Sequence, residues 1–128
     1  LIFVKETIMP KKTVSVPQDK LDLYGKLIDT NPKIERKGVT NPYTSHNGHM
    51  FSHLSKSGSL GLRLPKEERE AFLEKYSTTL YESHGAIMKE YVTVPDELLE
   101  NTAELQPYLE ISYEYIKSLK PKPTKKVK

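Results

Sequence analysis

Two short apolar runs joined by a glycine-containing turn constrain this chain more than any other feature. The runs occupy residues 50–54 and 60–64, and the polar segment between them carries Gly58 where a hairpin turn most easily takes a positive φ. Pro65 ends the second run, and acidic residues then open a helix with apolar positions at Ala71, Phe72 and Tyr76. The pattern predicts a strand, a turn, a strand and a core-facing helix.

Further elements follow from residue spacing on either side of this unit. We predict a helix from Pro17 to about Thr30, a short polar strand at Ile34–Lys37, strands at Thr78–Tyr81 and Ile87–Val94, a helical turn at Pro95–Glu100, and a long amphipathic helix after Asn101. Strands separated by so few residues pair as antiparallel hairpins. The predicted fold class is therefore α+β, in two layers, with an antiparallel sheet of about four to five strands and helices packed on one face.

Three features of the predicted helices bear on how they pack and where they begin. Gly25 lies inside the first helix, where glycine costs up to about 1 kcal/mol relative to alanine, so we expect a close packing contact there. Asn101 and Glu104 have the spacing of a reciprocal helix cap. Pro107 then either kinks the last helix or begins it.

Length and charge layout favour one folded domain with two different ends. We expect residues 17–120 to form the domain, residues 1–16 a flexible arm whose first eight residues precede a natural start at Met9, and residues 121–128 a basic disordered tail. The net charge is +3, yet residues 1–116 carry 14 basic and 17 acidic groups. The positive excess lies in six lysines after Glu114, a candidate non-specific nucleic-acid tether: Lys117, Lys120, Lys122, Lys125, Lys126 and Lys128.

The composition and motifs argue against several classes of function. The chain has no cysteine, which rules out disulfides, thiolate chemistry and cysteine-based zinc sites. No apolar run approaches the roughly twenty residues of a membrane span, so we expect a soluble, cytoplasmic protein without membrane contact. Acidic and basic residues interleave over 66–75 as on a solvated helix face, and no GxSxG, P-loop, GxGxxG or HExxH sequence occurs. We therefore predict neither an enzyme nor a cofactor.

Three histidines have the spacing of a metal cluster only if they lie on a helix. There, His49 and His53 would be neighbours about 6 Å apart, with His46 nearby. The predicted strand instead separates His49 from His53 by roughly 13 Å, which is too far to share one ion. We expect no metal site, and surface histidines flanking Phe51. Replacing His53 should then leave stability nearly unchanged.

The aromatic residues are mostly tyrosine, with eight tyrosines against three phenylalanines. Five of the tyrosines fall on apolar positions, so we expect their rings in the core with the hydroxyls at its edge: Tyr24, Tyr76, Tyr91, Tyr108 and Tyr115. The alternative role is stacking on nucleic-acid bases, which needs exposed rings beside basic side chains. Tyr43 and Tyr81 remain candidates for that role.

The same stretches resemble a known family. Residues 41–72 and 88–120 carry the ordered apolar and turn residues of the TfoX/Sxy N-terminal domain: Gly48, Met50, Phe51, Gly58, Leu60, Leu62, Arg63 and Leu64, then Tyr91, Val94, Pro95, Asp96 and Leu98. The resemblance implies a small two-layer α+β domain of the type shared with secretion chaperones. Full-length family members carry a second, C-terminal domain and regulate competence-gene transcription through a partner transcription factor. This chain resembles the N-terminal domain alone.

Two hypotheses of function result. The first is a non-enzymatic interaction module, a stand-alone TfoX-like domain related to transcription regulation that binds a protein partner or a second copy of itself. The second is nucleic-acid binding through the lysine-rich tail, with affinity that falls steeply as salt rises. Enzymatic activity ranks third.

Overall fold

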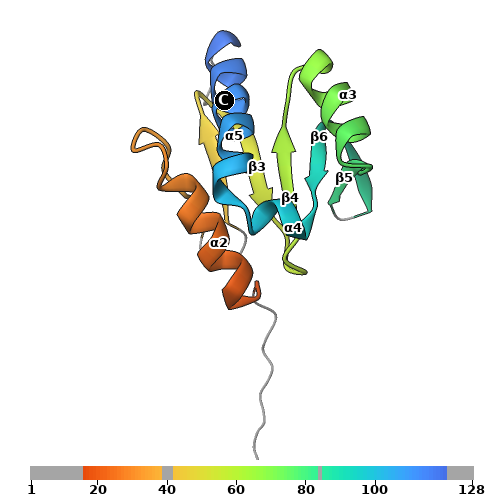
Figure 1. The fold of residues 1–128 in the computed structure, drawn as a ribbon. Helices are drawn as coiled ribbons and strands as arrows, with labels where there is room; N and C mark the ends of the chain where they lie inside the picture. The colour runs from red at the N-terminus through yellow and green to blue at the C-terminus, as the bar shows by residue number, and fades with distance from the viewer. Residues whose placement is uncertain (1–15, 39–41, 84, 121–128) are drawn as a thin grey trace, which may run out of the picture.

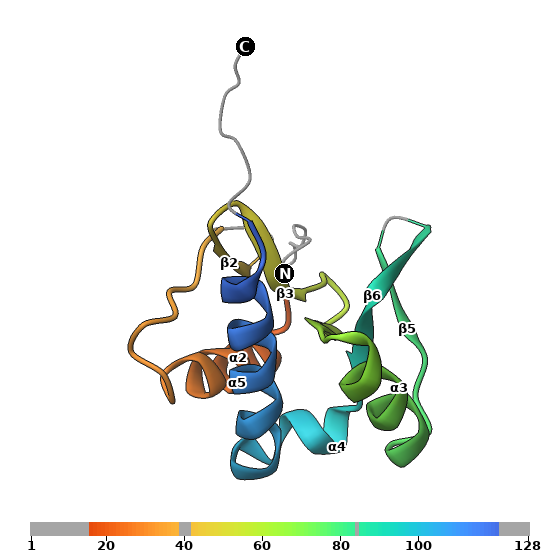
Figure 2. The ribbon, with the colours of Figure 1, turned by 90° about the horizontal axis from the view of Figure 1, so that it is seen from above.

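The computed structural model describes residues 16–38, 42–83 and 85–120, which form two layers (Figure 1). One layer is a five-stranded sheet of order β2-β3-β4-β6-β5, in which all neighbouring strands are antiparallel. Seen from above, the helices lie together on one side of this sheet (Figure 2). The predicted α+β class, the antiparallel sheet and the helical layer are confirmed.

The elements follow the predicted order, except that one strand is additional and the strand predicted at Ile34–Lys37 is absent. Their bounds are α2 Gln18–Ile28, β2 Tyr43–His46, β3 His49–Leu54, β4 Leu60–Arg63, α3 Lys66–Lys75, β5 Leu80–Ser83, β6 Ala86–Val94, α4 Asp96–Leu99 and α5 Thr102–Ser118. The additional strand is β2, which the sequence did not indicate because the strand is only four residues long and is polar. Asn47 and Gly48 join β2 to β3 with φ angles of 56° and 83°, the positive values that a two-residue hairpin turn needs.

A β-bulge in β3 changes which residues face the helices. The register with β2 shifts after Thr44, so that Phe51 becomes an extra residue of β3. The ring of Phe51 is buried, and its centre lies 5.8 Å from that of Tyr113 on α5. Nearer the turn, Nε2 of His49 lies 2.7 Å from the carbonyl oxygen of Lys120. Through Phe51 and His49, the start of β3 thus contacts the last part of α5 and the residues that follow it.

The hydrophobic core lies between the sheet and the helices. Leucines and valines of β4 and β6 pack against apolar residues of α2 and α5, and the fully or almost fully buried members are Leu60, Leu62, Val92, Val94, Leu27, Leu105, Leu109 and Ile116. Val16, before α2, belongs to the same cluster. Since each such side chain stabilises the fold by about 1.5–3 kcal/mol when fully buried, this packing holds the helices on the sheet.

Two local predictions about the N-terminal half are wrong. Ile34–Lys37 is not a strand, because only an isolated bridge pairs Lys37 with Tyr43, while Ile34 packs into the core. Gly25 makes no close packing contact, because a Cβ built there would have no atom within 4 Å. Glycine at this position is therefore not required by the packing of the described residues.

The start of the last helix follows the first of the two predicted alternatives. α5 begins at Thr102 and contains Pro107. The backbone N–H of Glu104 donates to Oδ1 of Asn101 at 3.3 Å, which satisfies one of the free N–H groups of the first turn. The Glu104 carboxylate meets the side-chain amide of Asn101 at 3.2 Å. The Asn101 half of the predicted reciprocal cap is thus confirmed, whereas Glu104 bonds to the Asn101 side chain in place of its backbone N–H.

Candidate functional site

Side chains connect helices α3 and α5. The ring of Phe72 on α3 packs edge-on against Tyr108 on α5, with ring centres 5.0 Å apart. The hydroxyl of Tyr76 also donates to Oε2 of Glu104 at 2.7 Å. The ribbons of α3 and α5 are apart along their length, and β4 is visible between them (Figure 1).

A groove lies between the start of α3 and the second half of α5. It has a volume of about 420 Å³, and we call it the α3–α5 groove, lined by Pro65, Glu68, Glu110, Ile111, Glu114 and Tyr115. Its apolar lining comes from both sides, with Pro65 before α3 and Ile111 and Tyr115 on α5. Glu68 on α3 and Glu114 on α5 place one acidic residue on each wall. The groove therefore combines an apolar surface with a negative rim.

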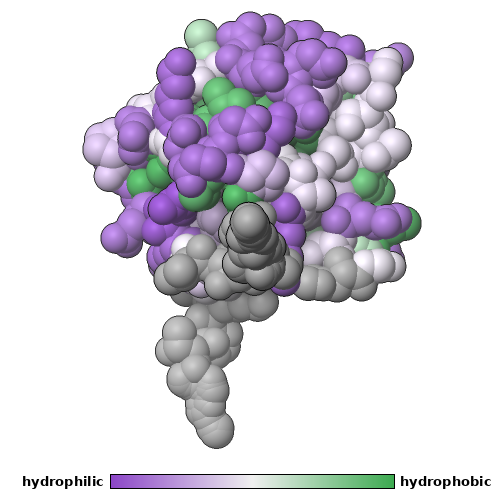
Figure 3. Space-filling model, turned by 90° about the horizontal axis from the view of Figure 1, so that it is seen from below, coloured by the Kyte–Doolittle hydropathy of each residue, from purple (hydrophilic) through white to green (hydrophobic). Residues whose placement is uncertain are grey.

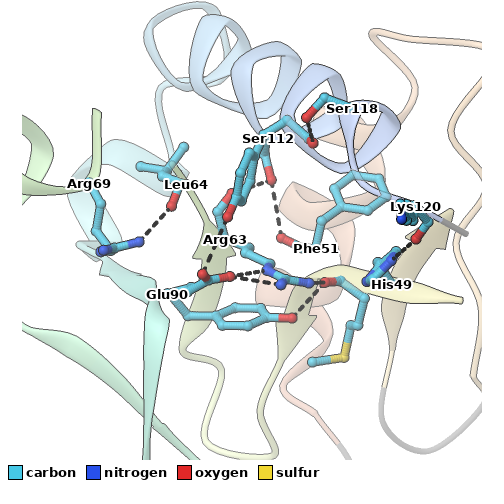
Figure 4. Close-up of polar contacts among 12 residues, drawn as sticks. His49, Phe51, Arg63, Leu64, Arg69, Glu90, Ser112, Ser118 and Lys120 are labelled. Atoms are coloured by element: carbon cyan, nitrogen blue, oxygen red, sulfur yellow. Dashed lines mark hydrogen bonds and ion pairs between the residues drawn. The ribbon is translucent and has the colours of Figure 1, made fainter. Parts of the chain in front are cut away.

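A partly buried ion pair contacts one lining residue of this groove, Tyr115. Nη2 of Arg63 lies 2.7 Å from Oε1 of Glu90, and the hydroxyl of Tyr115 donates to Oε2 of Glu90 at 3.3 Å (Figure 4). The guanidinium of Arg63 lies 5.8 Å from the centre of the Tyr115 ring. The hydroxyl of Tyr91 and the Arg63 guanidinium both donate to the carbonyl oxygen of Met50, at 2.6 and 3.4 Å. These contacts join β3, β4, β6 and α5, and they fix the position of Tyr115.

The charge of the helical layer is strongly negative. α3, α4 and α5 contain nine acidic and four basic residues, a net charge of −5. Burial, and then the negative charge of Glu90, raise the pKa of the Tyr115 hydroxyl, so this group remains a protonated donor at neutral pH. A polyanion would be repelled by this face, whereas a cationic partner would be attracted.

A second cavity lies beside the β3–β4 turn. It has a volume of about 550 Å³ and is lined largely by hydroxyl-bearing residues, with His53 and Tyr81 among them. Nδ1 of His53 lies 2.8 Å from the Tyr81 hydroxyl, which donates to the carbonyl oxygen of Ser59 at 3.3 Å. The sequence predicted only a surface position for His53. In the structure its ring also contacts Tyr81, which the sequence did not indicate.

Three of the histidines lie on two paired strands of the sheet. His49 and His53 lie on strand β3 and His46 on β2, as the strand interpretation requires for the first two. In the described part of the chain, no group of three His, Asp or Glu side chains could hold a metal ion. The ring of His46 instead packs edge-on against Tyr113, with ring centres 5.5 Å apart.

The tyrosine predictions hold for the core and fail for one candidate stacking ring. Four of the rings predicted in the core belong to it or pack against it: Tyr24, Tyr76, Tyr108 and Tyr115. Tyr91 is buried outside that cluster, beside the ring of Tyr81. Tyr81 is only 1% exposed, so its ring cannot stack on a nucleic-acid base, which removes it as a candidate for that role. Tyr43 is half-buried at the edge of the sheet.

Only part of the predicted lysine tether lies within the described residues. Nζ of Lys117 lies 3.0 Å from Oε2 of Glu114 and 4.9 Å from the centre of the Tyr113 ring. The hydrogen bond with Glu114 raises the pKa of Lys117. Lys120 is the last described residue, and Lys122, Lys125, Lys126 and Lys128 lie outside the described residues.

Comparison with known proteins adds no relative. No family model matches the chain, and no curated protein sequence matches it. The groove and its charges must therefore be interpreted from their own geometry.

Within 16–38, 42–83 and 85–120, every helix is too short or too polar to cross a bilayer.

Proposed function

We propose that this protein is a non-enzymatic interaction domain that binds a protein partner through the face formed by α3 and α5. The observation that carries the proposal is the α3–α5 groove, where Ile111 and Tyr115 offer an apolar surface between acidic walls. Interfaces of this kind combine a central apolar contact with a polar rim. The resemblance to TfoX/Sxy N-terminal domains supports a regulatory setting for such binding, in the cytoplasm.

Other features of the described residues support binding over catalysis. The polar groups beneath the groove bond to one another: Arg63 with Glu90, and Glu90 with Tyr115. None of them is arranged as a nucleophile next to a general base. Figure 3 shows the molecule from below. Among the described residues on this face, hydrophilic residues separate small hydrophobic patches. The lining of the α3–α5 groove is also more apolar than that of the cavity beside the β3–β4 turn, which favours the groove as a docking surface.

The proposal can be tested by partner capture with matched charge reversals. The tagged full chain is compared with Glu114→Lys, on the groove wall, and with Glu97→Lys, on α4 away from the groove. Glu114 has a 65% exposed side chain, so its replacement should leave the fold intact. We expect a specific protein to be recovered by the wild type and Glu97→Lys and lost with Glu114→Lys. Equal recovery by all three, or recovery of no protein or second copy by the wild type, would contradict the proposal.

A second function is favoured by the charge layout of the sequence. Six lysines follow Glu114, whereas the helical layer is negative. Weak, non-specific binding of nucleic acid through these lysines is compatible with partner binding by the folded domain. Such binding should weaken steeply with salt, because it depends on the release of counterions from the phosphates.

A further inference from the structure

We infer that the α3–α5 groove takes an amphipathic helix that carries lysine or arginine residues beside its apolar stripe. This inference rests on the proposed function and names the class of partner. It follows from the shape of the groove, the chemistry of its surface and the charges on its two walls.

The shape fits a helix better than an extended peptide. The groove lies between two helices, and its walls are side chains of α3 and α5. An extended peptide gains affinity mainly from backbone hydrogen bonds to a free strand edge, and this groove offers none. A helix needs only side-chain contacts, because its own backbone groups are already paired. A third helix can therefore pack across α3 and α5 in the same way that helices pack in a bundle.

The groove surface provides an anchor for apolar side chains. Ile111 and Tyr115 are four residues apart on α5 and lie on one side of it, with Pro65 opposite them. A volume of about 420 Å³ is in the lower part of the range of ligand pockets, roughly 300–1,000 Å³, so the groove can hold more than one side chain. Because Glu90 holds the hydroxyl of Tyr115, the anchor is already in place before a partner binds.

The charges select a basic helix over an acidic one. Glu68 and Glu114 lie on opposite walls, so cationic side chains flanking an apolar stripe would meet a carboxylate on each side. Glu114 is now paired with Lys117, one turn away and exposed. Exposed pairs of this kind contribute little, so an incoming cation can replace Lys117 at small cost. An acidic helix would instead meet like charge on both walls.

Other occupants fit the groove less well. The directed polar groups at its base, Arg63, Glu90 and Tyr115, already bond to one another, so few remain to orient a small polar ligand. The net charge of −5 on α3, α4 and α5 disfavours a nucleic acid. The carboxylate of Glu110 accepts hydrogen bonds from the side-chain amide of Asn31, so it faces the α2 side and adds little to the charge of the groove.

The test uses two synthetic helical peptides of leucine with either lysine or glutamate. They share the same apolar stripe and differ only in charge. Each is titrated into the full chain, and binding is followed by amide NMR. We expect the lysine peptide to cause saturable shifts at the start of α3 and around Ile111 and Tyr115, and the glutamate peptide to cause none. Binding of the glutamate peptide with equal affinity, shifts confined to another surface, or no binding of the lysine peptide would overturn the inference.

Two pairs of substitutions distinguish binding in the groove from general attraction between opposite charges. Glu68→Gln with Glu114→Gln should weaken binding of the lysine peptide about five- to ten-fold. The matched control, Glu97→Gln with Glu100→Gln beside α4, removes the same charge and should change affinity less than about two-fold. Equal loss in both pairs would show non-specific attraction and overturn the inference. If the lysine peptide fails while partner capture still depends on Glu114, the inference fails and the proposed function stands.

Discussion

Tyr81 and Gly61 are in direct contact, because the Tyr81 ring lies against the glycine backbone in the middle of the sheet. A Cβ built on Gly61 would overlap Cδ2, Cγ and Cε2 of that ring. Gly61 is on β4 and Tyr81 on β5, and β6 lies between these strands. The ring therefore crosses β6 to reach Gly61, which explains why Tyr81 is only 1% exposed.

This contact makes Gly61 sensitive to the smallest substitution. Gly61→Ala should lower the free energy of unfolding by about 1–3 kcal/mol, because the ring or the strand must move to make room. Urea denaturation measures the change. In a Tyr81→Ala background, the same substitution should cost much less, since the overlapping ring is gone. An equal cost in both backgrounds would show that the Tyr81 contact is not the cause.

Substitution of Gly25 by alanine should raise the free energy of unfolding, whereas the same substitution of Gly61 lowers it. Gly25 lies inside α2, and a Cβ there would have nothing within 4 Å. Gly25→Ala should therefore stabilise the protein by up to about 1 kcal/mol, because alanine loses less backbone entropy in a helix. Thermal or urea unfolding checks this. A destabilised Gly25→Ala protein would mean that a close contact exists at this position after all.

The hydroxyl of Ser112 should contribute to the stability of the fold. Ser112 is fully buried on α5, and its hydroxyl donates to the carbonyl oxygen of Arg63 at the end of β4 (Figure 4). Ser112→Ala should cost about 1–3 kcal/mol, since the buried carbonyl loses a donor. Ser118→Ala is the control, because Ser118 makes a similar bond to the Tyr115 carbonyl in an exposed position. Similar costs for both substitutions would contradict this account of α5 docking.

Stability should fall at alkaline pH in a defined window. Burial raises the pKa of both Tyr81 and Tyr91 to about 12 from 10.0, and in Tyr91 the charge of Arg63 partly offsets this. The folded state thus holds these protons more tightly than the unfolded chain. Their contribution to stability is complete below a pH of about 10 and is lost as pH rises toward about 12. Urea midpoints across this range should decrease, and less so in Tyr81→Phe. A flat profile would contradict the assigned burial.

The fold was largely predictable because its strong signals are local. The hairpin at 50–64, the helix after Pro65 and the capped helix after Asn101 each carry their own turn or cap residues. Strand β2 was missed because its buried residue is Thr44, a hydroxyl that bonds to Ser52 and not an apolar side chain. Such a polar pair inside a core gives no alternating apolar pattern.

The candidate site was less predictable, because it depends on distances between elements. The sequence correctly indicates a charged α3, but it cannot show that α3 lies close enough to α5 for Phe72 to contact Tyr108. Similarly, Tyr81 looked free to stack because nothing in its own strand reveals Gly61 two strands away. The acidic residues and the apolar pair Ile111 and Tyr115 were visible, but their meeting in one groove was not.

The central claim is that the folded domain binds protein and leaves nucleic acid to the C-terminal lysines. The most direct measurement is duplex DNA binding at low and moderate salt, with the full chain and a full-length variant in which glutamine replaces Lys122, Lys125, Lys126 and Lys128. We predict weak binding by the wild type, with a log–log salt slope no steeper than about −5 for six lysines, and much weaker binding by the variant, which keeps Lys117 and Lys120. Binding by the variant as strong as that of the wild type would show that the folded domain itself recognises nucleic acid, and the claim would be wrong.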